Sequence, residues 1–352
     1  MVKEGFQGRG AAGNPTNRFV KLSVIPDPDA PADDSPAPAT TFFVDSTRVA
    51  IATNDSPDIG FEASINPYRG CEHGCIYCYA RPFHELLGFS AGLDFETKIM
   101  VKRDLPRLLR EELSSPKWTP KYISMSGVTD PYQPAERSLR LTRQCLEILA
   151  EFRNPVGIVT KSALVKRDAD LLGDLAKHRA AAVCLSITTL DNDLAAKMEP
   201  RASSPRRRLE AISALASAGV PVGVMMAPII PGLNDHEIFS ILEAAAQAGA
   251  TFASYVPIRL PLAVAELFSD WLGRVFPQRK EKILNRIRAM RDGKLNNSDF
   301  GARMRAGGVW GEQFDSVFDL ARRKSGLVGP FPKLSSAAFQ RPARECEQLS
   351  LF

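Results

Sequence analysis

The chain contains the run Cys71-Glu72-His73-Gly74-Cys75-Ile76-Tyr77-Cys78-Tyr79, in which three cysteines lie within eight residues. Their spacing is C-x3-C-x2-C, and no fourth cysteine lies nearby. A closed structural zinc site uses four ligands, and a common four-iron cluster uses four cysteines. Three thiolates therefore predict a metal centre with one open coordination position, where chemistry can take place. The alternative is a zinc knuckle with His73 or His84 as its fourth ligand.

On either side of this run the chain is organised into segments of different character. From about residue 65, β-rich runs alternate with helical patterns, which predicts an α/β fold with a parallel sheet and right-handed crossovers. We expect a flexible Pro/Asp-rich segment at 1–60, a core at 61–260, a helical basic extension at 261–345 and a tail at 346–352. After a first strand that ends just before Asn66, strands are predicted at Tyr122–Ser126, Val156–Thr160, Ala182–Ile187, Val222–Ala227 and Phe252–Val256.

Composition and charge narrow the class of protein. The 352 residues are 44% hydrophobic and 24% charged, as in a soluble globular protein. Residues 1–13 lack the apolar region of a signal peptide, and the longest apolar stretch, 220–233, is interrupted by three prolines. We therefore expect a cytoplasmic protein that does not enter the membrane. Ten Lys and Arg against three acids at 271–305, and a second cluster at Arg201 and 206–208, predict either a nucleic-acid surface or a solvated helix face.

The cysteine run resembles the signature of the radical S-adenosylmethionine superfamily, in which an aromatic residue, here Tyr77, precedes the last cysteine. The resemblance implies a partial (β/α)6 TIM-like barrel and a [4Fe-4S] cluster on Cys71, Cys75 and Cys78. It also implies that the unliganded iron chelates S-adenosylmethionine. Reduction by an external donor such as flavodoxin or ferredoxin then releases a 5′-deoxyadenosyl radical. Tyr77 and Tyr79 together resemble the spore-photoproduct-lyase-like branch, whose members are similar to DNA repair photolyases.

Polar residues follow the predicted strands, and in α/β barrels such positions carry catalytic groups. Ser126, Thr129 and Asp130 follow the second strand, where the resemblance implies contact with the methionyl amino group. The alternative is that Asp130 caps the next helix. Lys161 ends the third strand in a Val-Thr-Lys run, which implies that it holds the cofactor's carboxylate. Ser186 ends the fourth strand, in a segment that touches the amino acid or ribose in the family.

One departure from the lyase pattern concerns the hydrogen donor. The lyase has a donor cysteine near the end of its second strand, whereas residues 124–133 here contain none. We therefore do not expect repair of the thymine lesion that the lyase repairs. Tyr77 and Tyr79 are the candidate catalytic residues that replace the missing donor.

The chain ends in Gln348-Leu349-Ser350-Leu351-Phe352. This tail resembles the pentapeptide by which bacterial DNA polymerases and repair proteins dock on the sliding clamp. Leu349, Leu351 and Phe352 suit an apolar groove, and the Gln348 amide can hydrogen-bond to its edge. The alternative is a terminus that packs on its own domain.

Together these features predict a radical S-adenosylmethionine enzyme, of the lyase or DNA-repair kind, that acts on a DNA lesion or modified base. Two alternatives remain open. One is a radical enzyme that modifies RNA or protein. The other is a non-enzymatic iron–sulfur or zinc accessory factor that binds DNA.

Overall fold

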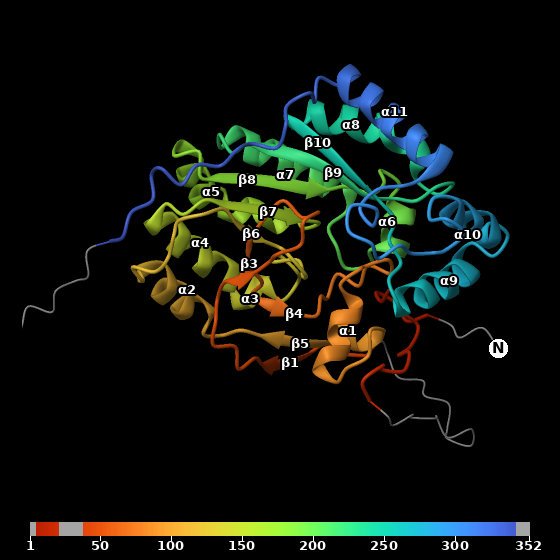
Figure 1. Ribbon diagram of the computed structural model, residues 1–352, viewed down its shortest axis with the longest axis horizontal. Coiled ribbons are helices and arrows are strands. Elements are labelled where there is room, and N and C mark those ends of the chain that lie inside the picture. The colour runs from red at the N-terminus through yellow and green to blue at the C-terminus, as the bar shows by residue number, and fades with distance from the viewer. Residues whose placement is uncertain (1–4, 21–37, 343–352) are drawn as a thin grey trace, which may run out of the picture.

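The computed structural model describes residues 5–20 and 38–342. A seven-stranded sheet lies at its centre in the order β10-β9-β8-β7-β6-β3-β2, and a three-stranded sheet, β1-β5-β4, lies beside it (Figure 1). The strands are β1 (Thr41–Val44), β2 (Ala52–Thr53), β3 (Ala63–Ile65), β4 (Tyr68–Arg69), β5 (Lys98–Val101), β6 (Ile123–Met125), β7 (Val156–Thr160), β8 (Ala181–Ser186), β9 (Val222–Ile229) and β10 (Phe252–Pro257).

The six strands β3, β6, β7, β8, β9 and β10 of the large sheet are parallel to one another, whereas β2 is antiparallel to β3. They occur in chain order across the sheet, so each connection crosses to the adjacent strand, as in a partial (β/α)6 barrel. Every residue of β8 is buried, which is typical of a parallel strand covered on both faces. The predicted α/β fold is therefore confirmed.

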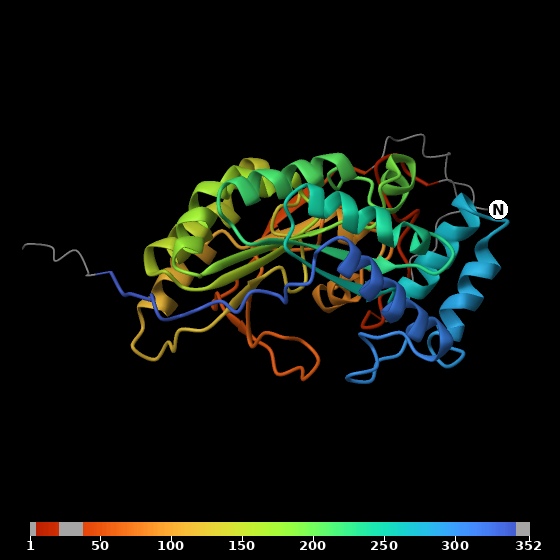
Figure 2. The same cartoon turned by 90° about the horizontal axis from the view of Figure 1, so that it is seen from above.

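Amphipathic helices cover one face of this sheet, as seen most clearly in Figure 2 for α4, α5, α7 and α8. The helix α4 buries Leu141, Cys145 and Leu149 at helical spacing. The helices are α1 (Leu93–Thr97), α2 (Leu105–Ser114), α3 (Glu136–Leu139), α4 (Leu141–Phe152), α5 (Ala169–Lys177), α6 (Asn192–Met198), α7 (Pro205–Ser217), α8 (Ile238–Gln247), α9 (Ala263–Val275), α10 (Lys280–Ala289) and α11 (Gly308–Lys324), with 3-10 turns η1 (Arg81–Leu87), η2 (Ala163–Asp168) and η3 (Asp235–Glu237).

Parts of the segment 1–60 are built into the fold, which differs from the flexible segment that we predicted. Strand β1 pairs with β5, and β2 pairs with β3. Asn17 Nδ2 donates to the carbonyls of Glu85 and Phe89, and Arg18 forms an ion pair with Glu85. Strand β5, Glu85 and Phe89 lie far along the chain from their partners, so local composition did not reveal these contacts. The Pro/Asp-rich stretch 26–36 lies outside the described residues.

The predicted clamp-binding residues 348–352 also lie outside the described residues. The segment after β10 contains α9, α10 and α11, of which α11 packs against α8. Among the helices of the described ranges, none has the length and apolar character needed to cross a membrane.

Candidate active site

The cysteine loop, residues 71–78, connects β4 to η1 and packs against the segment that follows β6. The buried Gln133 side chain joins the two, because its Oε1 accepts from Glu72 N at 2.9 Å and its Nε2 donates to Gly70 O at 3.2 Å. Thr129 Oγ1 donates to Tyr68 O at 2.9 Å. The loop therefore lies at the carboxyl edge of the parallel strands, where α/β barrels carry their active sites.

The three thiols of this loop lie close enough to influence one another's ionisation. Burial raises the pKa of Cys71 well above its ordinary value, and the charges of Asp130, Cys75 and Cys78 add to this effect. Burial likewise raises the pKa values of Cys75 and Cys78. Thiolates gathered in this way need positive charge from a bound metal, which deprotonates its ligands. The donor set therefore fits an iron–sulfur cluster on Cys71, Cys75 and Cys78.

Both histidines of the zinc alternative have other surroundings. His73 Nδ1 lies 3.4 Å from Asp130 Oδ2, and the His84 ring packs edge-on against Phe95. Among the residues that the structure describes, no three His, Cys, Asp or Glu side chains converge as ligands of a single ion.

Arg81 is fully buried and donates hydrogen bonds to the backbone of the cysteine loop. Its Nε donates to Cys75 O at 3.0 Å and its Nη2 to Gly74 O at 3.1 Å. Nη2 also forms an ion pair with Glu96 Oε1 at 2.6 Å, and the Glu96 carboxylate is equally buried. All three nitrogens are used, since Nη1 donates to the carbonyls of Ala91 and Gly92.

A docked N-terminal strap, residues 8–19, completes this support. Gly10 N and Ala11 N donate to the two oxygens of Glu96 at 3.0 and 2.9 Å. A Cβ on Gly10 would lie 2.0 Å from Gly74 O of the cysteine loop, so only glycine permits the approach. The strap therefore packs directly against the loop that carries the thiols.

Lys161 follows β7 and faces the cysteine loop. Its Nζ lies 5.7 Å from the centroid of the Tyr77 ring, and its charge favours ionisation of Cys75. Within the described ranges, no carboxylate lies within 4.0 Å of this ammonium. An unpaired cation beside the three thiols can bind an anionic group of a ligand.

Asp130 follows β6 and is held by the protein itself. It accepts from Thr160 Oγ1 at 2.7 Å and from Lys161 N at 2.8 Å. Burial opposes its ionisation, but the neighbouring His73 and these hydrogen bonds outweigh burial and lower the pKa of Asp130 to about 2. The carboxylate therefore ties the cysteine loop, through His73, to the end of β7.

The capping alternative for Asp130 is limited to a local turn, in which Tyr132 N donates to Asp130 Oδ1 at 2.9 Å. The helix α3 that follows has no side-chain cap.

The two predicted serines lie just beyond or at the ends of their strands. Ser126 directly follows β6 with a φ of 137°, a strained value for a residue with a side chain. Ser186 Oγ donates to Ala227 O at 3.2 Å.

A buried polar network that the sequence did not reveal surrounds Tyr77. The Tyr77 hydroxyl donates to Glu199, which also accepts from Thr188 Oγ1 at 2.6 Å and pairs with Arg208. Arg208 Nη1 donates to Ser186 O at 2.9 Å. Both interpretations of the basic cluster, a nucleic-acid surface or a solvated helix face, are therefore wrong for Arg208, because it is 1% exposed and neutralised by Glu199.

Tyr79 has the opposite environment to Tyr77. Its side chain is 42% exposed, and its hydroxyl donates to Gly127 O at 2.9 Å. The guanidinium of Arg259, which the sequence did not single out, lies 5.4 Å from the centroid of its ring. Tyr79 is thus the accessible one of the two predicted catalytic tyrosines, next to Cys78 and beside the end of β6.

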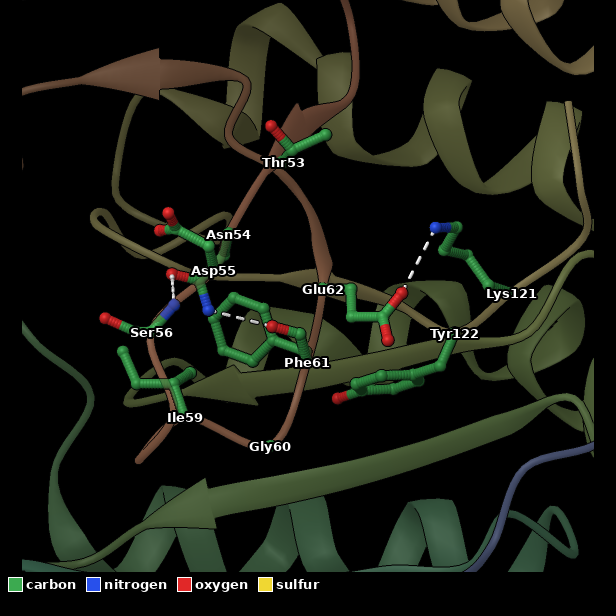
Figure 3. Close-up of a pocket in the computed structure, with 10 residues that line it drawn as sticks. All are labelled: Thr53, Asn54, Asp55, Ser56, Ile59, Gly60, Phe61, Glu62, Lys121 and Tyr122. Carbon is green, nitrogen blue, oxygen red and sulfur yellow. Dashed lines mark hydrogen bonds and ion pairs between the residues drawn. The ribbon is translucent and has the colours of Figure 1, made fainter. Parts of the chain in front are cut away.

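One cavity of the protein does not coincide with this site. It has a volume of about 750 Å³ and is lined by residues 53–56 and 59–62 together with Lys121 and Tyr122 (Figure 3). Glu62 and Lys121 directly precede β3 and β6, so the cavity opens at the amino end of these strands, opposite the cysteine loop. We therefore place the chemistry at the cysteine loop and not in this cavity.

The chain matches a known protein family over a region that contains the cysteine loop. A sequence model of the Radical SAM superfamily matches residues 65–245. An uncharacterized protein of Mycobacterium tuberculosis strain H37Rv is 36% identical over 220 residues, or 62% of this chain. The match covers 65% of that relative, so the chain spans somewhat less than two thirds of its length.

Two further relatives carry descriptive names. A protein of Pseudomonas phage M6 named radical SAM Nalpha-GlyT isomerase is 26% identical over 172 residues, covering 49% of this chain and 34% of that protein. Among solved structures, spore photoproduct lyase complexed with dinucleoside spore photoproduct aligns with a TM-score of 0.58. The alignment covers 80% of this chain and 79% of the lyase at 16% identity, which shows a shared fold.

Proposed function

Because this chain belongs to the radical S-adenosylmethionine superfamily, we propose that it is an enzyme that cleaves or rearranges a bond in a base of DNA. The superfamily uses a [4Fe-4S] cluster and S-adenosylmethionine, which together supply a carbon radical able to remove a hydrogen atom from a substrate. The observation that carries the proposal is the pairing of a three-thiol loop with the free Lys161 ammonium at one edge of the sheet.

In this proposal each residue of the site has a defined task. Cys71, Cys75 and Cys78 hold the cluster, and Lys161 binds the carboxylate of the cofactor as a point charge. Asp130 fixes Lys161 through its backbone N–H and the cysteine loop through His73. The side chain of Asp130 therefore acts as a positioning group. Both of its oxygens already accept hydrogen bonds from the protein, so the methionyl ammonium would have to share one of them.

The two tyrosines divide the site into a closed and an open side. Tyr77 is buried against Glu199 and forms a wall of the cofactor site. Tyr79 is exposed and follows the last cysteine, so it faces the substrate and is the better placed hydrogen donor. This assignment takes the place of the donor cysteine that residues 124–133 lack.

DNA is proposed as the substrate on three grounds. Spore photoproduct lyase, which has a similar fold, is described in complex with dinucleoside spore photoproduct. A relative in sequence is named as an isomerase. The exposed Tyr79 ring offers a surface on which a base can stack. The terminal pentapeptide resembles a sliding-clamp motif, which would bring the enzyme to DNA.

The test has two stages. The first is anaerobic reconstitution and reduction in the presence of S-adenosylmethionine, which should yield 5′-deoxyadenosine in the wild type but not in a triple Cys71→Ala, Cys75→Ala, Cys78→Ala variant. No 5′-deoxyadenosine from a fully loaded protein would favour the accessory-factor alternative. The second stage compares nucleosides from cells with and without the protein. A difference confined to RNA, or absent from both nucleic acids, would contradict DNA as the substrate.

A further inference from the structure

Arg259 lies two residues after the end of β10, at the carboxyl edge of the sheet. Its guanidinium lies over the ring of Tyr79, the residue that follows Cys78. Tyr79 in turn donates to Gly127 O, beyond the end of β6. The guanidinium is therefore beside the cysteine loop, on the open side of the site.

The donors of Arg259 are poorly satisfied. Among residues 5–20 and 38–342, no carboxylate lies within 4.0 Å of it, and its one polar contact is Nη1 to Met304 Sδ at 3.0 Å. A thioether sulfur is a weak acceptor. Its Nε is buried with no partner in the described part of the chain. A guanidinium carries five N–H donors. A buried donor that makes no hydrogen bond costs free energy.

Two further arginines increase the positive charge at this place. Arg303 pairs with Asp58, and its Nε lies 2.7 Å from Asp58 Oδ2. The loops that carry these two residues lie on the side of the sheet opposite the outer helices (Figure 2). Arg291 is buried and donates to backbone carbonyls, including Ile258 O at 2.9 Å. Burial and then the charge of Arg303 lower the pKa of Arg259. Burial and then Arg259 lower the pKa of Arg291 to about 10.

Arg259 and Arg303 lie near the carboxylate of Asp58, which pairs with Arg303, and Arg291 lies near Arg259. Three guanidinium groups and one carboxylate leave an excess of two positive charges. Buried charge is normally neutralised by a partner of opposite sign. The ion pairs of the described residues supply only Asp58 to this group, and a bound anion would balance the remaining charge. The half-buried guanidinium of Arg259 suits an oxyanion that can accept two parallel hydrogen bonds.

We propose that Arg259, flanked by Arg303 and the Tyr79 ring, forms an anion-binding subsite for a phosphodiester of the substrate strand. This inference rests on the proposed action on nucleic acid. In addition, the protein binds the phosphodiester backbone beside the target base, while the base itself stacks near Tyr79. Guanidinium groups favour phosphate because the planar fork matches two phosphate oxygens.

The test measures binding of a labelled single-stranded DNA of about 12 nucleotides to the reconstituted protein by anisotropy, at several salt concentrations between about 50 and 200 mM. Arg259→Met should weaken binding about 10- to 100-fold at the lowest salt, as expected for lost charge-assisted hydrogen bonds. It should also reduce the slope of log affinity against log salt by about 0.7, the value for one phosphate contact on a single strand.

Arg206→Met is the matched control, because Arg206 lies on the outer helix α7 with its side chain 87% exposed. It should bind DNA as the wild type does. Affinity for S-adenosylmethionine and iron content should be unchanged in both variants. If Arg259→Met does not fold, the wild type is treated with a guanidine-specific dicarbonyl. Bound DNA should then protect Arg259 but not Arg206 in the peptide map.

The outcomes separate this inference from the proposed function. Equal DNA binding by wild type and Arg259→Met overturns the subsite but leaves DNA as the substrate. Weaker cofactor binding in Arg259→Met also overturns it, since Arg259 would then belong to the cofactor site. If the wild type binds no DNA but binds polyglutamate through Arg259, the subsite takes a carboxylate, and both the phosphodiester and the proposed substrate fail.

Discussion

Replacement of Arg81 by methionine tests the physical basis of the cysteine loop. The side chain is fully buried and donates five hydrogen bonds, four of them to backbone carbonyls and one to the equally buried Glu96. Methionine fills much of the same volume but makes none of these bonds. It leaves the Glu96 carboxylate buried without its cation and removes the donors that hold Gly74 and Cys75.

Removing one partner of a buried ion pair costs about 3–5 kcal/mol. The free energy of unfolding of a typical domain is about 5–15 kcal/mol, so the loss is a large fraction of the total. We expect Arg81→Met to lower the free energy of unfolding of the apoprotein by about 3–5 kcal/mol. The reconstituted variant should also retain much less iron, because the loop that carries the thiols is no longer fixed.

Denaturant unfolding of the anaerobic apoprotein measures the first quantity, and iron content after desalting measures the second. Arg206→Met removes an exposed ion pair with Glu210 and should change stability by less than about 0.5 kcal/mol. Arg81→Lys keeps the charge but not the fork and should fall between wild type and Arg81→Met. A loss below about 1 kcal/mol for Arg81→Met would refute the reasoning, since a cost that small is typical of an exposed pair.

Three further predictions concern the cofactor, the lesion and the tail. Lys161→Ala should weaken S-adenosylmethionine binding by about 1–3 kcal/mol by calorimetry while iron content is preserved, and unchanged affinity would remove Lys161 from the site. The protein should not repair dinucleoside spore photoproduct at a normal rate, because residues 124–133 contain no cysteine. If repair is observed, its loss in Tyr79→Phe would identify the replacement donor. Deleting residues 348–352 should abolish micromolar binding to purified sliding clamp without affecting cofactor cleavage, whereas equal binding by both proteins would exclude the tail.

Local patterns in the sequence were sufficient for most of the fold. The strand β7 begins and ends at the predicted residues, Val156 and Thr160, because apolar runs and helical periodicity depend on near neighbours. The three-cysteine loop was recognisable for the same reason, since its ligands are close in the chain. The position of Lys161 at a strand end followed from the strand prediction.

Contacts between distant residues could not be predicted in this way. Gly10 N meets Glu96 across 86 residues, and nothing near Gly10 indicates that partner. Arg208 and Arg259 both look like ordinary surface charges in the sequence. The structure separates them, because Arg208 pairs with Glu199 whereas the described residues leave Arg259 without a carboxylate.

We propose above all that the enzyme removes a hydrogen atom from DNA. Its most direct test supplies the reduced, reconstituted enzyme with S-adenosylmethionine and deuterated DNA isolated from cells that lack the protein, or with deuterated RNA or protein from the same cells. Mass spectrometry then follows deuterium into 5′-deoxyadenosine, and into S-adenosylmethionine in case the cofactor is regenerated. We predict transfer from DNA alone. Transfer only from RNA or protein, or cofactor cleavage with no transfer from any of the three, would contradict the claim.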